Sequence, residues 1–148
     1  MRADFETIHV ARPDDHILLV TLNRPEASNA LNTRMGLDLV EVFEKFSVDL
    51  QGLRAVIITG SGDKAFCAGG DLKERNGMTD AEWQGQHLIF ERMARALMAC
   101  PVPLIAAVNG AAYGGGCEIA AASDFVYAAT HARFALTEVT LGIMPGTG

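Results

Sequence analysis

The pattern of hydrophobic and polar positions along the chain predicts six short β-strands. Runs in which apolar, mostly β-branched side chains alternate or continue over a few residues are typical of strands. Such runs, separated by polar or glycine-containing stretches, cover residues 6–10, 17–22, 55–59, 104–108, 125–128 and 133–136.

Two longer segments repeat apolar residues at the three- and four-residue spacing of an amphipathic helix. The first begins near Thr33, a candidate N-cap, and its apolar face would carry Met35, Leu39, Phe43, Phe46 and Leu50. The second begins with a capping box formed by Thr79 and Glu82, and its apolar face would carry Trp83, Phe90, Met93 and Leu97. Pro101 marks the end of this second helix.

A third, short and buried helix is expected where Gly114 to Gly116 lead into a run of small apolar residues that reaches Ala122. Strands that alternate with helices predict an α/β fold. The length of 148 residues fits one domain, and a chain that is 49% hydrophobic and 20% charged can form a packed core.

The charge balance argues against a nucleic-acid partner, because 12 basic residues face 18 acidic ones and no basic run occurs. The N-terminal residues lack the apolar core of a secretory signal, and no apolar run is long enough to cross a bilayer. We therefore expect no membrane partner.

The cysteines and histidines indicate a reducing compartment and no metal. Three widely spaced cysteines, Cys67, Cys100 and Cys117, do not form a disulfide framework, which favours a cytoplasmic protein with a mitochondrial matrix form as the alternative. The histidines lack the spacing of metal ligands; they are His9, His16, His87 and His131. No histidine is placed to activate Cys67 or Cys117 as a nucleophile, so packing is the simpler role for both.

The first glycine-rich loop, TGSGDKAFCAGGDLKE, spans residues 59–74. Phe66 and a second glycine pair interrupt the helix that a dinucleotide-binding motif requires, and no Gly-Lys-Ser/Thr follows to make a P-loop. The simpler interpretation is a turn at residues 61–63, followed by exposed main-chain N–H groups at residues 68–70, just before a helical turn near Asp71. An ordinary glycine-rich turn is the alternative.

The second loop, Gly114 to Gly116, opens the third helix, whose first N–H groups have no partner within the helix. Two such loops that each follow a strand can direct two N–H groups at one oxygen and form an oxyanion hole. Glu118 follows at once among small apolar residues, so its carboxyl group is expected to be poorly solvated, which suits proton transfer. The alternative is that Glu118 only caps its helix.

Four sequence blocks together resemble the enoyl-CoA hydratase/isomerase family, also called the crotonase family. In order along the chain they are NRPEASNALN, AFCAGGDLKE, PLIAAVNGAAYGGGCEIAAASD and FALTEVTLGIMPGTG, beginning at residues 23, 65, 103 and 134. The resemblance implies a crotonase-like spiral of repeated β-β-α units with two roughly perpendicular sheets, and residues 1–148 would form one core domain. Family members usually continue into further helices, so we expect a chain that is truncated at its C-terminus.

The resemblance also implies the site. Main-chain N–H groups of Ala68 and Gly115 would form the oxyanion hole, and Glu118 and Glu138 would be the two catalytic glutamates. Residues that line the acyl and pantetheine path would be Ala68, Gly69, Gly70, Asp71, Leu72, Tyr113, Gly114 and Gly115. Residues that contact the CoA moiety would be Glu26, Ala27 and Ala30. Arg24 or Lys73 is either a contact for a CoA phosphate or a solvated surface residue.

The implied function is hydration of the 2,3 double bond of an enoyl-CoA thioester. Coenzyme A is part of that substrate, no separate cofactor is implied, and the full-length protein would form a trimer or a dimer of trimers. Two glutamates favour hydration, because a Δ3-Δ2-enoyl-CoA isomerase can operate with one carboxylate. That isomerase, another crotonase-type acyl-CoA enzyme and a non-catalytic fragment are the alternatives.

Overall fold

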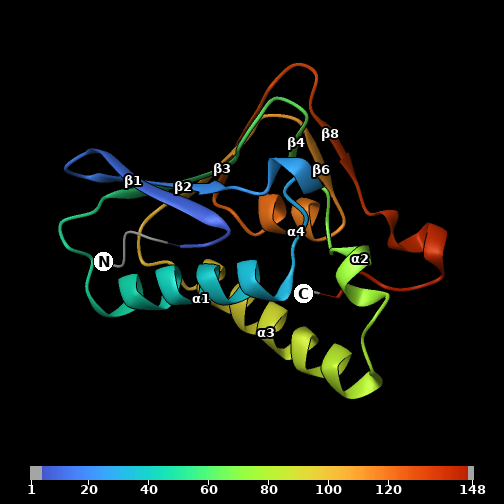
Figure 1. Cartoon of the computed structure of the whole chain (residues 1–148). Helices are drawn as coiled ribbons and strands as arrows, with labels where there is room; N and C mark the ends of the chain where they lie inside the picture. Colours follow the sequence, from blue (N-terminus) through green and yellow to red (C-terminus); the bar gives the residue numbers. More distant parts are fainter. Residues whose placement is uncertain (1–4, 147–148) are drawn as a thin grey trace.

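The computed structural model describes residues 5–146, which form two sheets with helices packed against them (Figure 1). The helices are α1 (Thr33–Val48), α2 (Leu72–Arg75), α3 (Asp80–Met98) and α4 (Gly115–Ala121), with short 3-10 helices η1 (Pro25–Ala27) and η2 (Thr137–Leu141). The strands are β1 (Ile8–Asp14), β2 (Ile17–Leu22), β3 (Ala55–Gly60), β4 (Ala65–Cys67), β5 (Leu104–Val108), β6 (Ala111–Tyr113), β7 (Phe125–Ala128) and β8 (Arg133–Ala135).

The larger sheet has the strand order β1-β2-β3-β5-β7, and the smaller sheet has the order β4-β6-β8. Across residues 5–146, only the β1–β2 hairpin is antiparallel, and the other strand pairs of the two sheets are parallel. Three successive strand pairs, β3/β4, β5/β6 and β7/β8, each send one strand to the larger sheet and the next to the smaller sheet. In Figure 1 β2 lies nearly horizontal while β8 runs steeply. This repeated unit confirms the predicted spiral α/β fold.

The core lies between the larger sheet and the pair of helices α1 and α3, which Figure 1 shows below it. Alternate residues of the central strands are buried on one face, as expected for a sheet with one covered side; they are Leu18, Val20, Leu22, Val56, Ile58, Leu104, Ala106 and Val108. The helices fill this space with their apolar faces, which carry Met35, Leu39, Phe43, Phe46, Phe90, Met93 and Leu97.

The two long helices follow the predicted pattern except at their ends. The N-cap of α1 is Asn32 rather than Thr33, because the Asn32 side chain accepts a hydrogen bond from the N–H of Met35. Leu50 lies beyond the end of α1, and Trp83 in the first turn of α3 is 47% exposed. Both were predicted on the apolar helix faces, and neither is part of the core. The capping box of Thr79 and Glu82 is confirmed.

Two short strands were not predicted from the sequence pattern. β4 lies inside the first glycine-rich loop and β6 lies directly before the second, and each has only three residues. Runs of this length carry too little alternation to be recognised, and they are held as strands by their parallel pairing with each other. β1 also begins later than predicted and extends to Asp14.

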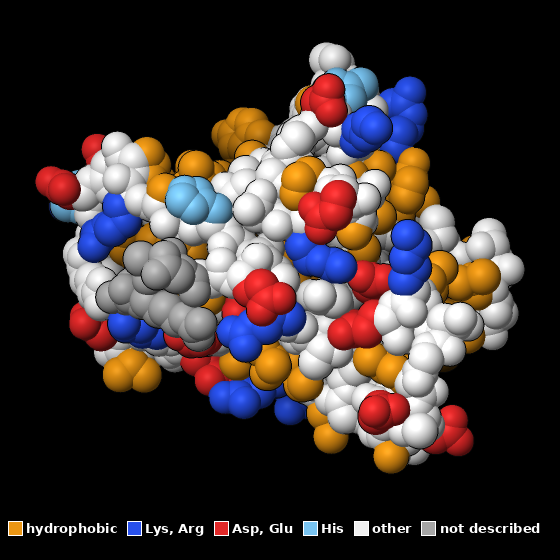
Figure 2. Space-filling model, in the orientation of Figure 1, with side chains coloured by type: hydrophobic (Ala, Val, Ile, Leu, Met, Phe, Trp, Pro, Cys, Tyr) orange, Lys and Arg blue, Asp and Glu red, His pale blue; other side chains and the backbone are white. Residues whose placement is uncertain are grey.

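The last part of the described chain exposes apolar side chains. All four residues of β7, at the edge of the larger sheet, are exposed, and so are Val139 and Leu141 in η2. Figure 2 shows hydrophobic side chains over η2 at the right of the molecule. Among residues 5–146 no helix is both long and apolar enough to cross a membrane.

Candidate functional site

A buried asparagine shapes the loop that follows β2. Asn29 is fully buried with a left-handed backbone, φ 54°, a conformation that asparagine tolerates better than most residues. Its Oδ1 accepts from the N–H of Arg24 at 2.9 Å and from Ser61 Oγ at 3.1 Å. Its Nδ2 donates to the main-chain oxygens of Ser61 and Ala65, each at 2.9 Å. The loop is thereby fixed to the first glycine-rich loop.

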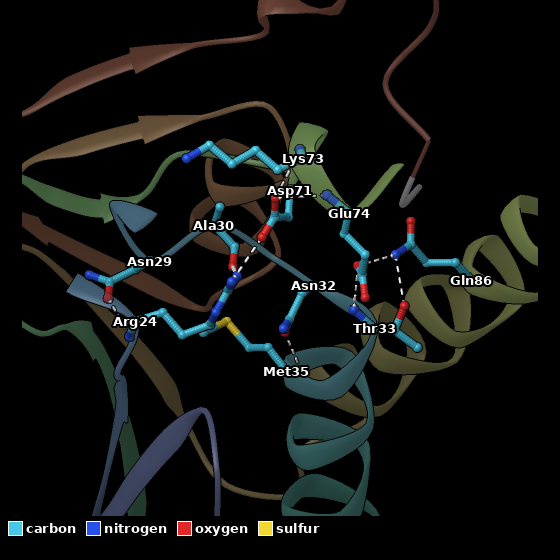
Figure 3. Close-up of polar contacts among 10 residues, drawn as sticks. All are labelled: Arg24, Asn29, Ala30, Asn32, Thr33, Met35, Asp71, Lys73, Glu74 and Gln86. Carbon is cyan, nitrogen blue, oxygen red and sulfur yellow. Dashed lines mark hydrogen bonds and ion pairs between the residues drawn. The ribbon is translucent and has the colours of Figure 1, made fainter. Parts of the chain in front are cut away.

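Arg24 also connects the loop after β2 to the first glycine-rich loop (Figure 3). Its guanidinium donates to the main-chain oxygen of Ala30 at 2.6 Å and to Asp71 Oδ2 at 2.8 Å. Asp71 is the N-cap of α2 and accepts from the N–H groups of Lys73 and Glu74. Burial alone would raise the pKa of Asp71, but the hydrogen bonds from Arg24 and from these main-chain groups lower it overall. Arg24 is therefore a partner of Asp71 rather than a solvated surface residue.

Close main-chain contacts bring the two glycine-rich loops together. A methyl group on Gly69 would lie 2.9 Å from the main-chain oxygen of Tyr113, and one on Gly116 would lie 2.2 Å from that of Cys67. Real Cβ atoms do not approach an oxygen so closely, so both positions require glycine. The first turn of α4 therefore lies directly against the end of β4.

The main-chain N–H groups at these loops differ in availability. The N–H of Ala68 donates to the main-chain oxygen of Ser28 at 3.1 Å, so it is not free to bind a thioester oxygen. The N–H groups of Gly70 and Gly115 make no hydrogen bond within residues 5–146. The assignment of Ala68 as an oxyanion donor is therefore wrong for this structure, and Gly70 is the available donor in the same loop.

These loops open onto a cavity of about 740 Å³. Four of the predicted site residues line it, namely Gly70, Gly115, Glu118 and Glu138. Apolar side chains form most of its wall: Leu31, Trp83, Phe90, Met98, Ile143 and Met144. Its further charged or polar lining comes from Arg75, His87, Glu91 and Arg95. A concave, mostly apolar site with a few polar groups is the usual form of a small-molecule site.

The remaining predicted site residues do not line this cavity; they are Glu26, Ala27, Ala30, Ala68, Gly69, Asp71, Leu72, Tyr113 and Gly114. Several of them support the loops instead. Gly69 approaches the main-chain oxygen of Tyr113, and the Cβ position of Gly114 lies beside the Glu138 carboxylate. Asp71 caps α2. Leu72 is 63% exposed and does not belong to the hydrophobic core.

The two glutamates lie beside the second glycine-rich loop. The Cβ position of Gly114 is 2.9 Å from Glu138 Oε1, and that of Gly115 is 3.9 Å from Glu118 Oε2. Glu138 comes from η2, so the chain must pass through β7 and β8 before it returns to this point. Within residues 5–146, Glu138 Oε2 is buried and has no hydrogen-bond partner. A buried oxygen of this kind is costly unless a bound molecule satisfies it.

The cysteines beside the cavity are poor nucleophiles. Burial raises the pKa of the Cys67 thiol to about 12. Burial and the neighbouring carboxylates of Glu118 and Glu138 raise the pKa of Cys117. Since the thiolate is the reactive form, both residues are expected to stay protonated and unreactive at neutral pH. Among residues 5–146 no group of three or more His, Cys, Asp or Glu side chains could hold a metal ion.

A partly buried polar cluster connects α2, α3 and the start of α1 (Figure 3). Gln86 on α3 is 2% exposed, and its Nε2 donates to Glu74 Oε2 at 2.7 Å and to Thr33 Oγ1 at 2.9 Å. Glu74 Oε2 also accepts from the N–H of Thr33 at 2.9 Å. Arg75 Nε donates to Gln86 Oε1 at 3.0 Å. Sequence reasoning did not identify Arg75 or Gln86, because nothing in their spacing shows that α2 and α3 face the same cavity.

Comparison with known proteins gives one consistent result. The model of the enoyl-CoA hydratase/isomerase family matches residues 12–148. The short-chain-enoyl-CoA hydratase of Clostridium acetobutylicum is 41% identical over 139 residues, which cover 94% of this chain and 53% of that protein. The carnitinyl-CoA dehydratase of Escherichia coli K12 is 43% identical over 147 residues, which cover 97% of this chain and 53% of that protein.

Solved structures agree with these matches. The crystal structure of the enoyl-CoA hydratase from Bacillus anthracis superposes with a TM-score of 0.92 at 38% identity, covering 97% of this chain and 55% of that one. The chain thus spans about half the length of the relatives it matches. Because the family model covers nearly all of the sequence and the fold agrees, the chain belongs to the enoyl-CoA hydratase/isomerase family.

Proposed function

We propose that the cavity binds an enoyl-CoA thioester and that Glu118 and Glu138 catalyse the addition of water across its 2,3 double bond. The observation that carries this proposal is that two carboxylates line the same cavity as two main-chain N–H groups that have no hydrogen-bond partner among residues 5–146. The N–H groups can bind an oxygen that becomes negative, and the carboxylates can move protons. Hydration of an unsaturated thioester requires both.

The oxyanion hole in this proposal consists of the N–H groups of Gly70 and Gly115. Addition of hydroxyl at Cβ places negative charge on the thioester oxygen, and two fixed donors stabilise that charge in the transition state. Gly115 begins α4, so the unpaired N–H groups of its first turn add to the attraction for negative charge. The loss of one such donor typically costs about 3–4 kcal/mol of transition-state stabilisation.

The proposed proton transfers use one water molecule and two carboxylates. Glu118 helps to remove a proton from the water as its oxygen attacks Cβ, and Glu138 delivers a proton to Cα. Both side chains lie beside Gly114 and Gly115, and the thioester carbonyl would lie at Gly115. Their positions therefore support proton transfer at the neighbouring Cα and Cβ. The buried, unpartnered Oε2 of Glu138 supports a role in which a substrate or water molecule completes its hydrogen bonding.

The CoA moiety is proposed to extend away from the cavity along the loop after β2. Glu26, Ala27 and Ala30 belong to that loop, which Asn29 and Arg24 hold against the first glycine-rich loop. This arrangement supports contact with CoA through Glu26, Ala27 and Ala30. We further propose that the protein functions as a trimer or a dimer of trimers once it has the length of its relatives.

The direct test is a spectroscopic hydration assay with crotonyl-CoA, in which the conjugated enoyl thioester absorbance disappears as water adds. The assay uses this chain and, in parallel, a chain extended to the length of its relatives. Loss of absorbance with formation of a 3-hydroxy thioester supports the proposal. Conversion of a 3-enoyl thioester into its conjugated isomer without hydration would instead support an isomerase.

A further inference from the structure

Arg75 presents a positive charge to the cavity and has no acidic partner in the described part of the chain. Its guanidinium is always ionised at physiological pH. Among residues 5–146 its partners are neutral: Nε donates to Gln86 Oε1, and the guanidinium carbon lies 5.8 Å from the centroid of the Phe90 ring. The N–H groups of Nη1 and Nη2 have no acceptor within residues 5–146. In this part of the chain the cation therefore lacks the counter-ion that a half-buried charge normally has.

The charged cavity residues on α3 are paired with one another. Glu91 lies 3.3 Å from His87 Nε2 and 3.2 Å from Arg95 Nη2, so these three side chains form one set on α3. Arg95 thus differs from Arg75, although both line the cavity, because Arg95 has a carboxylate beside it. Glu118 and Glu138 lie at the second glycine-rich loop and make no ion pair with Arg75 within residues 5–146.

The position of Arg75 depends on Gly70. A methyl group on Gly70 would lie 2.9 Å from the guanidinium carbon of Arg75 and 3.0 Å from its Nη2. The missing side chain of Gly70 therefore leaves the space that the guanidinium occupies. The contact with Gln86, which is itself held by Thr33 and Glu74, fixes the side of the guanidinium that faces away from this space. The guanidinium of Arg75 is therefore held in position before a ligand binds.

From this geometry we infer that Arg75 binds a carboxylate at the far end of the acyl chain, so that the substrates are short-chain enoyl thioesters with a terminal carboxylate. This inference rests on the proposed function, because Gly70 is the residue whose N–H would hold the thioester oxygen. A guanidinium so close to Gly70 can reach only a group that lies a few carbon atoms from the thioester. The remaining edge of the guanidinium, formed by the N–H groups of Nη1 and Nη2, can donate to the two oxygens of a carboxylate.

The test compares the binding of two saturated five-carbon thioesters, glutaryl-CoA and pentanoyl-CoA, which differ only in a terminal carboxylate and cannot be hydrated. Trp83 is the single tryptophan of the chain and lines the cavity, so its fluorescence reports binding, with calorimetry as a second measurement. We expect glutaryl-CoA to bind about 10- to 100-fold more tightly, the range for a hydrogen-bonded charged group. Arg75→Met should bring the two affinities close together, whereas the matched Arg95→Met should preserve the preference.

The outcomes separate the inference from the proposed function. Equal binding of the two thioesters by the unaltered chain would overturn the inference alone, and it would leave Arg75 free to act on the thioester oxygen instead. A preference that survives in Arg75→Met would also overturn it. Binding of neither thioester would overturn the proposed function itself, and the inference with it. Circular dichroism of each variant verifies that the fold is retained.

Discussion

Gly116 lies so close to the end of β4 that a methyl group there would come within 2.2 Å of the main-chain oxygen of Cys67. This contact sets the distance between the two glycine-rich loops and therefore between the N–H groups of Gly70 and Gly115. We predict that Gly116→Ala lowers the free energy of unfolding by about 1–3 kcal/mol or more, as overpacking of a core does. Urea denaturation of the 148-residue chain measures this.

Gly85 provides the matched control for that substitution. It lies at an exposed position in the N-terminal part of α3, and an added methyl group would meet nothing within 4 Å. Gly85→Ala should raise the free energy of unfolding by about 0.5–1 kcal/mol, because alanine is the better helix former. Equal effects of the two substitutions would mean that the Gly116 contact is not tight.

Asn29 is expected to be the most sensitive polar residue of the loop after β2. Asn29→Ala removes the partners of Arg24 N–H and of two main-chain oxygens, and it places alanine at a positive φ. We predict a loss of at least about 3 kcal/mol in the free energy of unfolding, because buried polar groups are left unpaired. Asn76→Ala, at an exposed position, should change it by less than about 0.5 kcal/mol. Comparable losses would argue against the buried network.

Asp71 should make stability depend on pH in the acidic range. Its pKa is lowered in the folded chain, so the charged form stabilises the fold above the ordinary aspartate pKa of about 3.9. That stabilisation is lost as the pH falls through the lower, folded-state pKa. Asp71→Asn should therefore cost about 1–3 kcal/mol at pH 7 and progressively less below pH ~4.

Asp63 in the exposed turn is the control for this pH series. Asp63→Asn should give an unfolding free energy that follows that of the unaltered chain at every pH, since no hydrogen bond or ion pair of its side chain occurs within residues 5–146. A deficit of Asp71→Asn that stays constant from pH 7 down to pH 2 would contradict the assigned pKa direction.

The long elements could be predicted from the sequence because their patterns are long. The faces of α1 and α3 and the alternating strands β2, β3 and β5 each repeat often enough to show their period. The three-residue strands β4 and β6 could not be predicted, since tertiary pairing rather than local pattern holds them. They are also the strands that deliver the glycine-rich loops to the cavity.

The sequence predicted the kinds of group in the site more successfully than the particular residues that supply them. The glycines and the two glutamates were identified, and the structure brings Gly70, Gly115, Glu118 and Glu138 to one cavity. The choice of Ala68 was wrong because sequence alone cannot show which N–H already has an acceptor; here that acceptor is the oxygen of Ser28. Arg75 was missed because the argument for its role uses three-dimensional facts: it has no acidic partner among residues 5–146, and its guanidinium occupies the space left by Gly70.

The central proposal, hydration by two carboxylates, is tested most directly by the rate of crotonyl-CoA hydration in Glu118→Gln, Glu138→Gln and the double variant. These are made in a chain extended to the length of its relatives. Each single substitution keeps the size of the side chain but removes its proton-transfer ability, so each should lower the rate about 10²- to 10⁴-fold. The double variant should be little worse than either, because the two groups act on one water molecule. Hydration at close to the unaltered rate after either single substitution would contradict the proposal and favour an isomerase.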